Sequence, residues 1–99
     1  MASKYQNMLK KLPNGWKKET YTGTWIVFRK KIKDRPDGKI EYHIIRIAES
    51  NRNVGGHWEI FKDFEVRDKN YLVDYNKLMD AMYFETKEEA LKKAKDWMD

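Results

Sequence analysis

The sequence contains no cysteine and no long apolar run. Without cysteine, disulfides and thiolate metal sites are excluded, which fits a reducing compartment. No stretch approaches the ~20 apolar residues that a membrane span needs. The first twelve residues show no long apolar run and no small-residue cleavage site, so we expect no signal peptide. We therefore predict a cytoplasmic protein that is not associated with a membrane.

Positive charge is unevenly distributed along the chain. The 99 residues include 21 Lys and Arg against 16 Asp and Glu, a net charge of +5. Residues 1–39 hold eleven basic and three acidic side chains, whereas residues 40–99 hold ten basic and thirteen acidic ones. A molecule with such a lopsided charge has a field that steers a polyanion to one side.

The length and the aromatic content together indicate one small globular domain covering residues 1–99. The chain has four Trp, six Tyr and four Phe. Each large ring buries roughly 150–250 Å², so a core can form without disulfide bonds.

Alternating apolar and polar residues predict an antiparallel sheet. A short strand is expected at residues 16–21, and clearer strands at 24–33, 40–49 and 57–66. The Pro36-Asp37-Gly38 segment predicts a turn, because proline presets φ and glycine accepts a positive φ. Period-two alternation divides residues 24–33 into two faces. Ile26, Phe28 and Ile32 fall on one face, and Trp25, Val27, Arg29, Lys31 and Lys33 on the other.

The helices are expected at the two ends of the chain. Residues 86–89, Thr-Lys-Glu-Glu, form a capping box. An apolar stripe of Ala90, Leu91, Ala94, Trp97 and Met98 follows, and we expect it to pack on the sheet. Residues 3–12 predict a short N-terminal helix that ends at Pro13-Asn14-Gly15.

Residues 67–82 are ambiguous, and we expect a loop and a helical turn or two before an extended piece at 83–84. The fold class is therefore α+β: a three- to four-stranded antiparallel sheet packed by a C-terminal α-helix, with a short N-terminal helix.

The leading candidate site is the cationic strand with its neighbouring loops. Basic side chains neutralise phosphates, and aromatic rings stack on exposed bases. The predicted nucleic-acid-binding residues are Trp25, Arg29, Lys30, Lys31, Lys33, Arg35 and, from the glycine-containing loop 51–56, Arg52. The alternative is a solvated sheet edge on which lysines prevent aggregation.

A second candidate is the polar face of the two strands that flank the loop around Asn53. Symmetric pairing about Asn53 would place His43 opposite Asp63 and Glu41 opposite Glu65, a set able to bind a metal or exchange protons. A shift of one residue would scatter this set, and no known catalytic or metal-binding motif accompanies it. An exposed polar face is favoured, so we predict no enzyme activity, no catalytic residue, no metal and no cofactor.

A third candidate is the aromatic and methionine-rich segment 71–84. Tyr71, Tyr75 and Met79 are predicted protein-binding residues, because such side chains suit adaptable contact surfaces. The favoured alternative is that they complete the core, since apolar residues at helical spacing normally face inward.

The segment Phe84-Glu85-Thr86-Lys87-Glu88-Glu89-Ala90 resembles the strand-then-helix ending of small DNA-binding domains of the AP2 and integrase-arm type. The resemblance covers about the last twenty residues and the strand order. Size and charge are also similar to those of small accessory proteins of bacteriophages. We expect a non-enzymatic binding module for nucleic acid, DNA or RNA. The alternative is a small protein-binding inhibitor or adaptor that acts on a host macromolecule.

Overall fold

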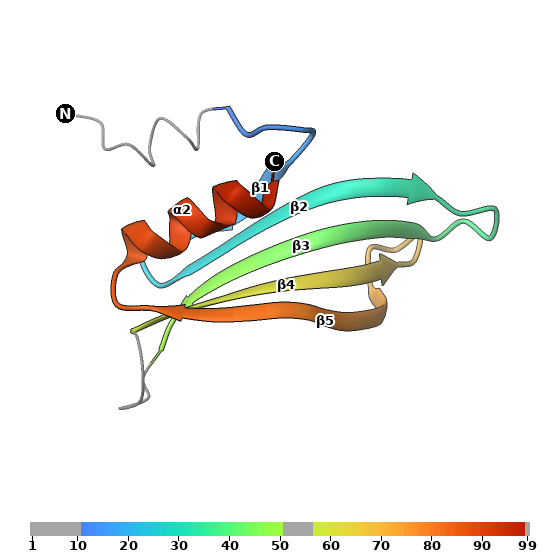
Figure 1. Ribbon diagram of the computed structural model, residues 1–99. Helices are drawn as coiled ribbons and strands as arrows, with labels where there is room; N and C mark the ends of the chain where they lie inside the picture. Colours follow the sequence, from blue (N-terminus) through green and yellow to red (C-terminus); the bar gives the residue numbers. More distant parts are fainter. Residues whose placement is uncertain (1–10, 51–56, 99) are drawn as a thin grey trace.

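A computed structural model describes residues 11–50 and 57–98 and shows one antiparallel sheet followed by one helix (Figure 1). The sheet is a five-stranded meander in the order β1-β2-β3-β4-β5. Its elements are β1 (Lys17–Tyr21), β2 (Trp25–Asp34), β3 (Ile40–Glu49), β4 (Trp58–Arg67), β5 (Val73–Phe84) and the helix α2 (Lys87–Met98). The α+β class and the C-terminal helix are confirmed, but the sheet has five strands rather than three or four.

The additional strand is β5, which includes most of the segment that the sequence left undecided. Its apolar residues have helical spacing in the sequence because two bulges interrupt the alternation of the strand. Met79 and Asp74 are the extra residues, since Lys62 and Asp63 pair with Asp80 and Leu78, and the register slips again between Val66 and Arg67. An extra residue in a strand breaks period two and imitates a helical pattern.

The N-terminal helix predicted for residues 3–12 lies mostly outside the described residues. Its described part, Lys11 and Leu12, is not helical. The chain then runs past the C-terminal end of α2 (Figure 1). The Asn14 side-chain amide donates a hydrogen bond to the Met98 carbonyl at 2.9 Å. Trp16 follows and is buried in the core, so this segment closes the open end of the helix–sheet layer.

The main core lies between α2 and one face of the sheet, which we call the helix face. The predicted apolar stripe supplies the helix side of this core, although Trp97 at its edge is only half-buried. The sheet side consists of Ile26, Phe28, Ile45, Ile47 and Ile60. The opposite face of the sheet, which we call the open face, carries a smaller cluster of Val27, Tyr42 and Ile44.

The helix begins at the predicted capping box. The Glu89 amide donates to the Thr86 hydroxyl oxygen at 3.2 Å, and that hydroxyl donates to the Glu89 carboxylate at 3.0 Å. These bonds satisfy a backbone donor that the first helical turn leaves unpaired.

The sheet is longer than the helix that covers it. Figure 1 shows α2 over one end of the sheet, while the end with the β2–β3 and β4–β5 turns extends past it. The β2–β3 turn is the predicted Pro36-Asp37-Gly38 turn, with Gly38 at φ 87°. The helix face of this projecting end is accordingly not covered by α2.

Candidate nucleic-acid interface

The predicted cationic strand does not present all its charges on one face. Lys31 pairs with Tyr42, and Lys33 pairs with Glu41, because Ile32 is an extra residue between them. Tyr42 and Glu41 are adjacent and point to opposite faces of the sheet. Lys31 therefore lies on the open face with Arg29, whereas Lys33 lies on the helix face. The expectation that the three share a face is wrong, because the bulge reverses the alternation.

The charged residues predicted for this site are mostly neutralised within the protein. Lys31 contacts Asp34 at 2.6 Å, and Arg29 lies 3.8 Å from Glu19. Lys33 and Arg35 both approach the Glu41 carboxylate, at 3.9 and 2.7 Å. Trp25 is exposed on the open face. Arg52 lies outside the described residues, so its predicted role rests on the sequence alone.

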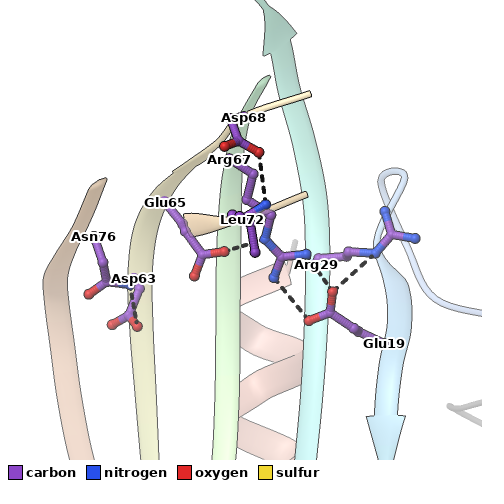
Figure 2. Close-up of polar contacts among 8 residues, drawn as sticks. All are labelled: Glu19, Arg29, Asp63, Glu65, Arg67, Asp68, Leu72 and Asn76. Carbon is purple, nitrogen blue, oxygen red and sulfur yellow. Dashed lines mark hydrogen bonds and ion pairs between the residues drawn. The ribbon is translucent and has the colours of Figure 1, made fainter. Parts of the chain in front are cut away.

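Arg29 is part of an ionic cluster at the centre of the open face. Figure 2 shows Glu19 of β1 between Arg29 of β2 and Arg67 of β4, with α2 behind the sheet. The Arg67 guanidinium donates to both Glu19 oxygens, at 2.6 and 3.1 Å, and also to the buried Glu65 carboxylate. Hydrogen bonding to Arg67 lowers the pKa of Glu19, and the bonds to Glu19 and Glu65 raise the pKa of Arg67. This cluster joins β1 to β4 across the sheet, and within the described residues the buried Arg29 Nε has an ion pair with Glu19 but no hydrogen-bond partner.

Tyr71 covers the ionic cluster from the β4–β5 turn. Its ring centroid lies 4.5 Å from the Arg67 guanidinium carbon and 6.1 Å from the ring centroid of Tyr42. The Tyr71 backbone has φ 70°, which few residues with a side chain adopt. The Asp68 carboxylate holds this turn by accepting from the Asn70 and Leu72 amides at 2.8 and 3.0 Å.

The predicted pairing of His43 with Asp63 is wrong by one residue. Asp63 pairs with Ile44, and His43 pairs with Phe64, so the two polar side chains point to opposite faces. Asp63 is instead completely buried on the open face, where Arg46 contacts it at 2.5 Å and the Asn76 amide donates to it at 3.1 Å. Across residues 11–50 and 57–98, no group of three or more His, Asp or Glu side chains is arranged to hold a metal ion.

A row of basic and aromatic side chains crosses the projecting end of the helix face. The register places Lys30 beside His43, His43 beside Phe64, and Phe64 beside Lys77, on four successive strands. Lys62 belongs to the next row of the same face, opposite Asp80. Tyr75 packs edge-on against Phe64 at 6.2 Å between ring centroids. We call this surface the basic platform. It comprises Lys30, His43, Lys62, Phe64, Tyr75 and Lys77.

The three platform lysines are not neutralised, in contrast to the predicted cations other than Lys30. Within the described residues, none of the three has an ion pair within 4 Å, whereas every Arg of that part of the chain does. The flanking carboxylates are Asp80 and Glu41, and Glu41 is already held by Arg35. The platform lysines therefore have charge available for an anionic ligand.

The pKa of His43 is affected by the positive charge of the platform. Burial lowers its pKa, and the positive charges of Lys62 and Lys30 lower it further. Its Nδ1 atom is buried without a hydrogen-bond partner among the described residues. The imidazole ring packs edge-on against Phe64 at 6.4 Å, so the platform has a continuous line of three rings between its lysines.

Sequence reasoning found only part of the platform. Lys30 was assigned to nucleic acid, and Tyr75 to a protein partner. Lys62 and Lys77 were missed because they lie in the half of the chain with a negative net charge. To find these lysines, one would have to know which acidic side chains lie near them on the same face of the sheet. That depends on the strand register, which the sequence does not specify.

The fold and this surface define a small α+β sheet domain with a basic aromatic platform beyond its helix. Comparisons of the chain with protein-family models, curated proteins and solved structures give no match. No helix in the described part of the chain has the length and apolar character needed to cross a bilayer.

Proposed function

We propose that this protein binds nucleic acid as a non-enzymatic module, with single-stranded DNA or RNA lying on the basic platform. The observation that carries the proposal is the juxtaposition of three unneutralised lysines with partly exposed rings on one sheet surface. Lysines neutralise phosphates without reading sequence, and rings stack on bases that are not paired in a duplex. Tyr75, with 51% of its surface exposed, offers the most accessible ring of the platform.

The test is binding of a fluorescently labelled single-stranded oligonucleotide, followed by anisotropy at several salt concentrations. We expect affinity to fall steeply with salt, because binding releases counterions. Replacing Lys30, Lys62 and Lys77 together by Gln should reduce the logarithmic salt slope by about two, since each phosphate contact on a single strand contributes roughly 0.7. Tyr75→Ala should weaken binding by about five- to a hundredfold through lost stacking.

The matched control removes the same charge from α2. Lys92, Lys93 and Lys95 lie on the helix, outside the platform, and their replacement by Gln changes the net charge equally. A separate variant, Lys31→Gln with Lys33→Gln, tests the strand predicted from sequence. Equal losses in the platform and helix variants would show general electrostatic attraction, and an absence of salt-sensitive binding would refute the proposal.

The second candidate is a protein-binding inhibitor or adaptor, as small accessory proteins of bacteriophages are. The observation favouring it is the exposure of Tyr71, Tyr75 and Met79, at 46%, 51% and 53%. Apolar anchors of this kind carry most of the energy of a protein interface. The test is recovery of a nuclease-resistant partner from lysate. Met79→Ser should abolish recovery without changing the melting temperature, and retention of the partner by this variant would count against an anchor at this position.

A further inference from the structure

The last strand forms a long edge of the sheet. Among residues 11–50 and 57–98, β5 has a neighbouring strand on one side only, β4. It spans twelve residues, whereas the opposite edge strand β1 spans five. The outer backbone groups of an edge strand have no strand partner and offer a template for pairing with another chain. An edge of this length therefore needs either protection or a partner.

Large apolar side chains follow this edge. Leu78 and Val73 are each 55% exposed, and the side chains of Tyr75, Met79 and Tyr83 are exposed to a similar degree. Natural edge strands are usually kept short or charged to prevent association. The apolar character of β5 favours a partner in place of solvent.

The charges of β5 are complementary to those of a second copy of the same strand. Asp74, Lys77 and Asp80 alternate in sign along it. When two copies pair antiparallel about a twofold axis between Leu78 and Met79, Lys77 of each copy lies opposite Asp80 of the other. The same symmetry places Leu78 opposite Met79, and it places no two like charges opposite each other. Opposite charges across strands stabilise a pair, and like charges destabilise it.

The Met79 bulge makes this register consistent with the faces of the sheet. Lys77 pairs with Phe64 and Asp80 with Lys62, so both point to the helix face despite their odd separation in sequence. Side chains directly opposite each other in an antiparallel pair must share a face. The bulge thus allows both ion pairs to form on the helix face.

We infer that β5 pairs with β5 of a second copy of this chain, so that a symmetric dimer has one continuous sheet through both subunits. The twofold axis stands perpendicular to the sheet, because it exchanges two antiparallel strands without exchanging their faces. Both helices and both basic platforms then lie on the same side. The inference rests on the edge strand and does not depend on what the platforms bind. In the dimer Lys77 is paired with Asp80 of the other copy, so Lys30 and Lys62 are the platform lysines whose charge stays available for an anion.

The experiment measures the molar mass of nucleic-acid-free protein by light scattering and sedimentation across a concentration series. We expect a dimer that dissociates on dilution. Lys77→Asp should weaken it about tenfold, because each of the two ion pairs becomes a like-charge contact. Asp80→Lys should weaken it similarly, and the double variant Lys77→Asp with Asp80→Lys should restore it, because the charges are exchanged. The control is Lys69→Asp, an exposed charge reversal in the β4–β5 turn, which should leave the dimer unchanged.

A chain that remains monomeric at about 1 mM would overturn the inference. A dimer that is unaffected by both single variants, or is not restored by the double variant, would overturn this pairing of β5. Because the readout is mass in the absence of nucleic acid, failure here is distinguishable from failure of the platform to bind an oligonucleotide.

Discussion

Among single residues, Arg67 has the strongest structural role on the open face. Its guanidinium lies between Glu19 and Glu65, and only 9% of its side-chain surface is exposed. Arg67→Ala would leave the buried Glu65 carboxylate without its cation, which is more costly than removing both partners. We expect a loss of about 3 kcal/mol in the free energy of unfolding, measured by denaturant titration. Lys69→Ala, in the adjacent turn, should change stability by less than about 0.5 kcal/mol.

Glu19 should make stability depend on pH in the acidic range. Hydrogen bonding to Arg67 lowers its folded-state pKa from the ordinary value of 4.5. A carboxyl group with a depressed pKa contributes its full stabilisation above the unfolded-state pKa and loses it as pH falls through the folded-state value. The melting temperature should therefore decrease as pH drops below about 4.5. The decrease should be smaller in Glu19→Gln, and identical pH profiles for the two proteins would contradict the assigned role of the ion pair.

Among the secondary-structure elements, α2 contributes most to the main core. Leu91 is buried against the sheet, whereas Lys92 is exposed on the same helix. Leu91→Ala removes buried methyl groups and leaves a cavity, so we expect a loss of about 3 kcal/mol in the free energy of unfolding. Lys92→Ala provides the control, since both variants introduce the same helix-favouring residue. Equal stability of the two variants would mean that α2 does not pack as described.

The strands show how bulges change the placement of charged side chains as well as the shape of the sheet. The extra residue Ile32 moves Lys33 to the helix face and into an ion pair with Glu41. The extra residue Met79 brings Lys77 and Asp80 to one face. Bulges redirect side chains in this way without ending a strand. The distribution of charge over the two faces therefore cannot be obtained by counting alternate residues.

At the scale of the whole molecule, the summed field of the platform should couple nucleic-acid binding to pH. Burial and the charges of Lys62 and Lys30 lower the pKa of His43 below its ordinary value of 6.5, so the imidazole is neutral at pH 7. A bound phosphate backbone favours the protonated form. Binding therefore takes up a proton as the imidazole begins to titrate, and affinity should rise as pH falls below about 6.5. The measurement is oligonucleotide anisotropy at constant ionic strength between about pH 5 and pH 7.5.

His43→Gln is the comparison for this pH dependence. It keeps a polar side chain but cannot gain charge, so its affinity should vary less over the same range. Glu41 lies on the same face and is held by Arg35, and Asp80 lies opposite Lys62, so both carboxylates are present in the two proteins. If His43→Gln keeps the full pH dependence of oligonucleotide affinity, His43 is excluded as the source of that dependence.

The sequence by itself determined the local elements of this protein. These elements depend on residues close together in the chain, so their patterns can be recognised in the sequence. They are the capping box at Thr86, the glycine turn at Gly38 and the alternation in β2, β3 and β4. Only the tertiary structure decided how these elements meet. The one-residue difference in the β3–β4 register separates His43 from Asp63, and pairing with β4 makes a strand of the ambiguous segment. Register and ion pairing join residues that are distant in sequence, and the free energies that select them arise only when the sheet is assembled.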